Sequence, residues 1–135
     1  MTYLVNANVL SEPTKPTADA KVVQWLRDNE GDFVVDPMIL GELLIGILSL
    51  PRGRKRSELE QWLSRIVQAI ECLKWDAAVS RRWAELVVDL KGKGQMAPLL
   101  DGMIAATALA HDLTVVTRNV SDFKNTGVRV FDPFA

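Results

Sequence analysis

Short runs of β-forming residues alternate with helical segments along the chain, and this alternation constrains the fold more than any other feature. The β runs cover Thr2–Val5, Phe33–Val35, Thr114–Val116 and Val128–Phe131, with a further short strand expected over Cys72–Lys74. Helical periodicity covers Asp19–Arg27, Ile39–Ile47, Ser57–Ile70, Ala77–Leu90 and the segment that contains Asp101. Strands that alternate with helices build a mostly parallel sheet covered on both faces. We therefore expect an α/β fold with three layers, α/β/α, around a central, mostly parallel sheet.

Length and composition indicate one globular domain over residues 1–135. The 135 residues suit a single core, and a hydrophobic fraction of 48% with 24% charged residues is ordinary for such a protein. The single cysteine, Cys72, excludes an internal disulfide and fits a reducing compartment. No apolar run is long enough for a membrane span, and the first residues lack the pattern of a secretory signal. We expect a cytoplasmic protein without membrane contact.

Asp101 is the one carboxylate in an otherwise apolar helical segment, Pro98–Leu109. Burying such a charge is costly unless another group compensates it. The β run Thr114–Val116 that follows ends in polar residues at Thr117–Asn119, and the first β run ends similarly at Asn6–Asn8. Ligands of open α/β sheets bind beyond the carboxyl ends of the strands. We therefore expect these polar residues to meet at one edge of the sheet.

Glu42 and Asp101 lie on apolar-rich helical segments that can reach the same edge. Oxygen ligands without cysteine or histidine suit Mg²⁺ or Mn²⁺. Such an ion lowers the pKa of a bound water and neutralises charge on a phosphate, so phosphodiester hydrolysis is the natural chemistry of the site. His111, the only histidine, falls near a helix end, which argues against acid–base catalysis by histidine.

Four motifs, in this order, resemble PIN-domain ribonucleases, and most closely the VapC-like toxins of bacterial toxin–antitoxin pairs. They are Leu4–Glu12 (LVNANVLSE), Gly41–Leu43 (GEL), Asp101–Ala108 (DGMIAATA) and Val116–Phe123 (VTRNVSDF). The resemblance covers essentially the whole chain. It implies a Mg²⁺- or Mn²⁺-dependent endoribonuclease that forms a homodimer and is inhibited by a cognate antitoxin. It also implies that operator DNA is contacted only through the antitoxin.

The resemblance assigns site residues one by one. Glu42 and Asp101 match metal-binding carboxylates of the family, and Thr117 and Asn119 match the polar cluster that helps to hold the metal and its waters. Asp122 belongs to the same motif, where it either joins the metal site or caps the next turn. The implied metal ligands are Asn6, Glu42, Asp101, Thr117, Asn119 and Asp122, of which Asn6, Glu42, Asp101 and Asn119 are the catalytic candidates.

The first motif departs from the family because Asn6 and Ala7 replace the usual leading acidic residue and the threonine after it. An amide oxygen can coordinate a hard cation but brings no charge. A unit charge about 4 Å from a dication interacts by roughly 8 kcal/mol at an effective dielectric constant of about 20. We therefore expect weak metal binding and poor cleavage. Asn6 is either the natural residue of a degenerate nuclease or an introduced change that inactivates a toxic nuclease.

Simpler structural roles compete with the functional ones. Glu42 can be a residue at the boundary of a core helix, and Asp101 a carboxylate favoured by a helix N-terminus. Asn8 and Ser11 can be turn or capping residues. The four tryptophans favour core or interface positions over base stacking: Trp25, Trp62, Trp75 and Trp83.

The dense basic run is Arg52, Arg54, Lys55 and Arg56. Such a run usually lies exposed to solvent at the start of a helix. The alternative is a lip that contacts RNA phosphates beside the acidic site, which a chain of net charge −1 can supply only as a local patch. The helical segments also carry more apolar residues than covering a small sheet requires, over Ile39–Leu50 and Leu59–Val67. These extra apolar residues predict a groove for an antitoxin helix.

Two functions from different classes remain. A metal-dependent ribonuclease is favoured by Glu42 together with Asp101. A non-catalytic PIN-type module that acts through an antitoxin or RNA partner is kept open by Asn6. A small-molecule enzyme of flavodoxin-like architecture is disfavoured, because no glycine-rich phosphate loop follows the first β run.

Overall fold

A four-stranded parallel sheet forms the centre of the protein, whose computed structural model describes residues 2–135. Its strands are β1 (Tyr3–Val5), β2 (Phe33–Val34), β3 (Thr114–Val116) and β4 (Arg129–Phe131), in the order β2-β1-β3-β4. In the register, Tyr3 is opposite Phe33 on one side and Thr114 on the other. The predicted α/β fold with a parallel sheet is confirmed.

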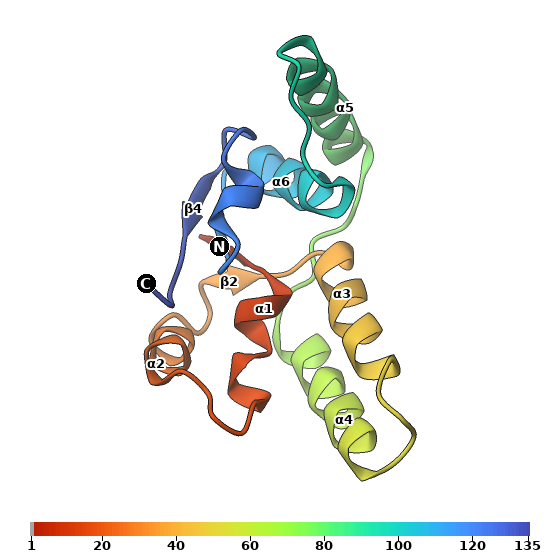
Figure 1. Ribbon diagram of the computed structural model, residues 1–135, viewed down its shortest axis with the longest axis vertical. Helices are drawn as coiled ribbons and strands as arrows, with labels where there is room; N and C mark the ends of the chain where they lie inside the picture. The colour runs from red at the N-terminus through yellow and green to blue at the C-terminus, as the bar shows by residue number, and fades with distance from the viewer. Residues whose placement is uncertain (1) are drawn as a thin grey trace.

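Six α-helices and two short 3₁₀ helices surround the sheet (Figure 1). They are α1 (Ala7–Leu10), η1 (Glu12–Thr14), α2 (Ala20–Asp28), α3 (Pro37–Leu48), α4 (Arg54–Ala69), α5 (Ala77–Gly92), α6 (Leu99–His111) and η2 (Val120–Phe123). Helices α3 and α4 run side by side, and α5 packs on α6 at the opposite end of the molecule. Within residues 2–135, no helix combines the length and apolarity that crossing a membrane requires.

Aspartates begin three of the helices, as capping chemistry predicts. The Asp36 carboxylate accepts the Ile39 N–H at 3.0 Å and starts α3, with Pro37 at the first helical position. Asp19 and Asp76 cap α2 and α5 in the same way. The helix expected over Ile39–Ile47 is therefore confirmed, and its cap places its start at Asp36–Pro37.

The structure corrects several sequence-based boundaries. Cys72 forms a single parallel bridge with Val35, so the expected strand over Cys72–Lys74 is wrong. Helix α4 begins at Arg54 instead of Ser57, because ion pairs four residues apart extend it through the basic run. Helix α5 continues through Gly92 instead of ending at Leu90. Val67 of α4, in the apolar segment Leu59–Val67, is 52% exposed.

Helix α1 was not expected, because Asn6–Asn8 has the composition of a turn. The chain instead turns directly from β1 into one helical turn that the Asn6 side chain caps. The core beneath it consists of aliphatic side chains of β1 and β3 and small residues of α6: Leu4, Val5, Val115, Val116, Ile104, Ala105 and Ala108. Helix α1 therefore begins at the edge where the two central strands end.

The strand order produces a switch point between β1 and β3. From β1 the chain passes to β2 on one side, and it later returns to build β3 and β4 on the other side. Connections that leave in opposite directions open a crevice at the carboxyl ends of the two central strands, where ligands of such sheets bind. Asn6 directly follows β1 and Thr117 directly follows β3, so both lie at this crevice.

Candidate metal and nucleic-acid site

A network of polar side chains joins the ends of β1 and β3. The Thr117 hydroxyl oxygen lies 3.2 Å from Asn6 Nδ2, 3.2 Å from Asn8 Nδ2 and 3.1 Å from the Asn119 backbone nitrogen, and it accepts from all three. Asn8 Oδ1 accepts the Arg118 backbone N–H at 3.1 Å. The predicted meeting of the two polar segments is confirmed, and Asn8 belongs to the network as well as to α1.

The amide of Asn6 has a fixed orientation. Its Oδ1 accepts the Ala7 backbone N–H at 2.8 Å and caps α1, so its amino group faces Thr117. The reversed amide would place two N–H donors against each other at Ala7, which determines the assignment. Asn6 therefore directs an N–H donor at Thr117. An aspartate at this position would direct a carboxylate oxygen, which is an acceptor, at the same hydroxyl. Its own oxygen has one lone pair left for a cation.

Hydrogen-bond donors outnumber acceptors in this network. A hydroxyl oxygen has two lone pairs, but three N–H groups converge on that of Thr117. The network is therefore one acceptor short, and a carboxylate at position 6 would supply it by accepting the Thr117 O–H. The geometry fits an acidic residue at position 6 better than the amide that is present.

Carboxylates from three elements lie near this network. Glu42 lies on α3, Asp101 in the first turn of α6 and Asp122 in η2, and all three are half-buried. Burial raises the pKa of Glu42, and repulsion from Asp101 and Asp36 adds to the shift. Burial also raises the pKa of Asp101, with a further contribution from Asp122. The carboxylates repel one another, and a cation between them would relieve that repulsion.

A shallow hollow connects Glu42 to the polar network. Its lining includes Glu42, Asn8, Ser11, Thr14 and the aromatic side chain of Trp62, and its volume is about 240 Å³. Glu42 Oε1 is buried without a hydrogen-bond partner. A buried acceptor without a partner is rare and is satisfied by water or an ion. Glu42 is therefore the clearest candidate for a metal ligand.

The residues present fit a divalent cation, although incompletely. The available ligands are carboxylate, amide and hydroxyl oxygens, the set that Mg²⁺ and Mn²⁺ prefer. Within residues 2–135, however, no three acidic, histidine or cysteine side chains are grouped closely enough to form a metal site by themselves. Glu42 and Asp101 provide two charges, and position 6 carries an amide where the family motif has an acidic residue.

Asp36 supports the site in a way that the sequence did not predict. Its side chain is fully buried, and Oδ2 accepts the Thr107 hydroxyl at 2.8 Å while Oδ1 caps α3. Asp36 therefore ties α3, which carries Glu42, to α6, which carries Asp101. Burial raises the pKa of Asp36 above its ordinary value of 3.8. In the sequence Asp36 is identifiable only as a helix cap, because nothing links it to Thr107, 71 positions away.

The other predicted residues fall in several places. Ser11 caps the C-terminus of α1 through its backbone and His111 is the last residue of α6, as the capping and helix-end interpretations predict. Trp25 packs edge-on against Tyr3, with ring centroids 5.0 Å apart. The side chains of the basic run lie at the start of α4 or just before it: Arg52, Arg54, Lys55 and Arg56.

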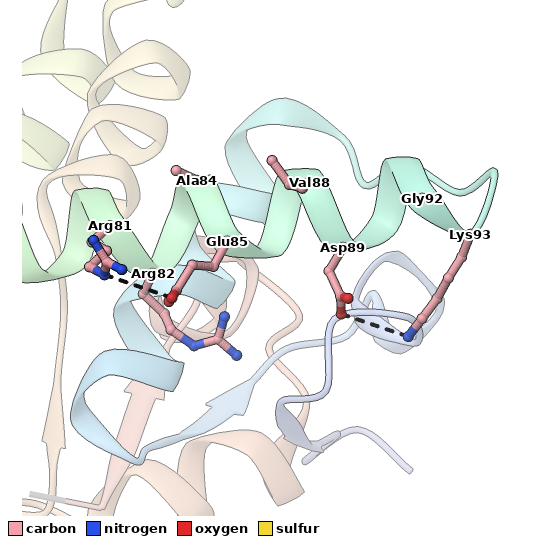
Figure 2. A pocket seen from close by; sticks show the side chains of 8 residues that line it. All are labelled: Arg81, Arg82, Ala84, Glu85, Val88, Asp89, Gly92 and Lys93. Carbon is pink, nitrogen blue, oxygen red and sulfur yellow. Dashed lines mark ion pairs between the residues drawn. The ribbon is translucent and has the colours of Figure 1, made fainter.

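A second hollow lies on the exposed face of α5, far from this network in the chain (Figure 2). Ion pairs along the helix border it, Arg81 with Glu85 at 3.8 Å and Lys93 with Asp89 at 3.7 Å. These side chains are more than half exposed, so the pairs contribute little to stability. None of the predicted site residues lines this hollow, and we place the candidate site at the switch point.

The raised pKa values predict an unusual pH dependence of stability. Asp36, Glu42 and Asp101 bind protons more tightly in the folded than in the unfolded chain. Between the ordinary values of 3.8 and 4.5 and the raised folded values, the folded state holds more protons, so their contribution to stability falls as pH rises. We expect E42Q to flatten this fall in metal-free urea unfolding between about pH 4 and pH 7. An unchanged pH slope would contradict the assignment.

A central parallel sheet covered by helices, with a polar network at its switch point, defines the class of this protein as a three-layer α/β/α fold. Residues 3–128 match the family model described as PIN domain. The chain belongs to the PIN domain family, as the four motifs predicted.

Two named relatives match over nearly the full chain. Toxin FitB of Neisseria gonorrhoeae is 33% identical over 97% of this chain and 97% of its own. VapC ribonuclease Y4jK of Sinorhizobium fredii is 30% identical over 97% of this chain and 96% of its own. In the structure of FitAB bound to an IR36 DNA fragment, one chain aligns with a TM-score of 0.90 and 30% identity, over 99% of this chain and 96% of that chain.

Proposed function

We propose that this protein is a metal-dependent endoribonuclease toxin of a toxin–antitoxin pair, with activity weakened by Asn6. The observation that carries the proposal is that Glu42, whose Oε1 is buried without a partner, lines one hollow with Asn8 of the polar network, and that Asp101 lies close enough to repel it. The name of Y4jK as a VapC ribonuclease and that of FitB as a toxin support the same function.

The residues have distinct roles in this proposal. Glu42 and Asp101 hold the cation, and Thr117, Asn119 and Asp122 orient it and its waters. A bound Mg²⁺ or Mn²⁺ supplies positive charge beside the RNA phosphate and makes a nearby water more acidic. The unpartnered Glu42 Oε1 is placed to accept a proton or a ligand bond within the hollow.

A direct experiment measures RNA cleavage in Mg²⁺ or Mn²⁺, with and without EDTA, for the protein and its E42Q variant. We expect slow cleavage that both EDTA and E42Q abolish. Cleavage that persists in E42Q or in EDTA would contradict the assignment of the site.

Asn6 also supports a second candidate function, a non-catalytic PIN-type module. Its amino group, and not a carboxylate, faces Thr117, and no three acidic, histidine or cysteine side chains of residues 2–135 form a cluster. In this case the chain binds its antitoxin or an RNA without cutting. Absence of cleavage both in the protein and in its N6D variant would favour this function.

We also propose a cognate antitoxin and a second copy of the chain as partners, with operator DNA contacted through the antitoxin. The relative FitB and the FitAB assembly on DNA support the antitoxin and the DNA. The family resemblance supports the homodimer, as do apolar side chains left exposed on α5, on the segment before α6 and at the first residue of α6: Val87, Val88, Met96 and Leu99.

The start of α4 is a candidate path for RNA. Arg54 and Lys55 line a hollow with Thr14 and Leu59, and these last two residues also line the hollow that contains Glu42. The two hollows are therefore adjacent. Arg56 is less available, because it pairs with Glu60 at 3.1 Å and its side chain is 23% exposed.

We therefore expect the double variant R54Q/K55Q to bind single-stranded RNA more weakly. Each lost phosphate contact lowers the slope of log K against log salt by about 0.7, so the double variant should lose up to about 1.4. The matched control is R81Q/R82Q on α5, which should leave the slope unchanged (Figure 2). Equal salt slopes for the protein and R54Q/K55Q would remove the basic run from the RNA path.

A further inference from the structure

Arg118 lies between two residues of the candidate site, Thr117 and Asn119. Its backbone N–H donates to Asn8 Oδ1, inside the polar network. Its side chain is engaged elsewhere, with the guanidinium carbon 4.5 Å from the centroid of the Phe134 ring. This is the geometry of a cation–π contact. Arg118 thus joins the site to the C-terminal segment that follows β4.

Contacts on both sides hold that segment in place. Lys21 Nζ donates to the Phe134 carbonyl at 2.8 Å, and the Phe134 N–H donates to Asp132 Oδ1 at 2.8 Å. Pro133 between them is buried. In Figure 1 the C-terminal end of the chain lies beside α2, the helix that carries Lys21. These contacts therefore hold the Phe134 ring in a fixed position.

Glu12 places a negative charge in the surroundings of the Arg118 side chain. The Glu12 carboxylate is buried and accepts the Asp19 backbone N–H at 2.9 Å, and Lys15 Nζ lies 3.0 Å from its other oxygen. The Asp19 N–H, then Lys15 and Arg118, lower the pKa of Glu12, so its charge and that of Arg118 attract each other. The guanidinium thus has an aromatic and an anionic neighbour, both remote from Glu42 in the chain.

Apart from the polar network around the Thr117 hydroxyl and Asn8, the segment that carries Thr117 and Asn119 has little regular backbone pairing. Strand β3 ends at Val116, and beyond it the ladder adds only the Thr117 N–H, which donates to the Phe131 carbonyl at 3.0 Å. Arg118 and Asn119 are exposed. An exposed segment without a regular ladder depends on its side-chain contacts for a fixed geometry.

We propose that Phe134 is a positioning residue, which fixes Arg118 and through it holds Thr117 and Asn119 in the geometry of the candidate site. The consequence for catalysis rests on the proposed ribonuclease function, whereas the consequence for the geometry does not. Phe134 itself lines neither the Glu42 hollow nor the Arg54 hollow.

The test compares F134L with F134Y. Leucine keeps an apolar side chain of similar size but removes the aromatic face, whereas tyrosine keeps that face. Amide NMR signals of Thr117, Arg118 and Asn119 should shift or broaden in F134L and remain near their original positions in F134Y. Equal spectra for the protein and F134L would overturn the proposal, and so would equal disturbance in both variants.

Cleavage in the N6D background adds a kinetic readout. F134L should lower kcat by about tenfold with KM nearly unchanged, because a small displacement of positioned groups reduces catalysis more than binding. F134Y should restore kcat. If N6D cleaves no RNA at all, the proposed function fails, while the NMR comparison still decides the role of Phe134. An unchanged kcat in F134L with active N6D would contradict the proposal.

Discussion

We expect replacement of Asn6 by Asp to raise metal-dependent RNA cleavage by at least about a hundredfold. The substitution turns a donor that faces Thr117 into an acceptor, which the Thr117 hydroxyl needs, and it retains the oxygen that caps α1. It also adds a charge to the network at the switch point. Because a unit charge about 4 Å from a dication contributes roughly 8 kcal/mol at a dielectric constant of about 20, even partial compensation by lost hydration leaves a large gain.

Two controls test whether a gain in cleavage comes from the charge at position 6. The double variant N6D/E42Q should lose the gain, since Glu42 carries the buried oxygen without a partner. N125D adds the same charge at an exposed position and should leave cleavage unchanged. Equal cleavage by the protein and N6D, in Mg²⁺ and in Mn²⁺, would show that position 6 does not limit the reaction.

Replacing Asp36 by Ala destabilises the protein by about 2–4 kcal/mol, the sum of a lost helix cap and a buried hydroxyl left without its partner. Asp36 is fully buried, caps α3 through Ile39 N–H and accepts the Thr107 O–H at 2.8 Å. In a domain of this size the loss corresponds to roughly 10 °C in Tm. Urea unfolding monitored by circular dichroism measures it.

The conservative variant D36N is the matched control. Its oxygen can still cap α3, and the Thr107 hydroxyl can turn to accept from the new amide, so we expect a loss of no more than about 1 kcal/mol. T107V should lose more stability than D36N and less than D36A, because it leaves one carboxylate oxygen of Asp36 without a hydrogen-bond donor. If D36N loses as much stability as D36A, the charge of Asp36 matters more than its hydrogen bonds.

The sheet and most helices were predictable because their signals are local. The β runs at Tyr3–Val5 and Thr114–Val116 and the cap at Asp36 depend on neighbouring residues only. Helix α1 was missed because Asn6–Asn8 resembles a turn, and only its position after β1 makes it a helix. The strand expected at Cys72 has one bridge partner, Val35, at the edge of the sheet, which the local sequence does not reveal.

The candidate site was predictable in its composition but not in its connections. Parallel topology brings the residues after β1 and β3 together, so the meeting of Asn6 with Thr117 followed from the sequence pattern. The convergence of three donors on one hydroxyl, and the link from Asp36 to Thr107, depend on side-chain orientation in the folded protein. The same is true of Phe134, whose stacking on Arg118 joins residues 16 positions apart.

The central claim is that Glu42 and Asp101 form a metal site that Asn6 leaves one charge short. Calorimetric titration of Mn²⁺ into the protein and into N6D tests it without any RNA. We expect N6D to bind Mn²⁺ with a Kd at least about a hundredfold lower, a gain of about 2.7 kcal/mol. Equal affinity in the two proteins would contradict the proposed metal site, because position 6 would then lie outside it.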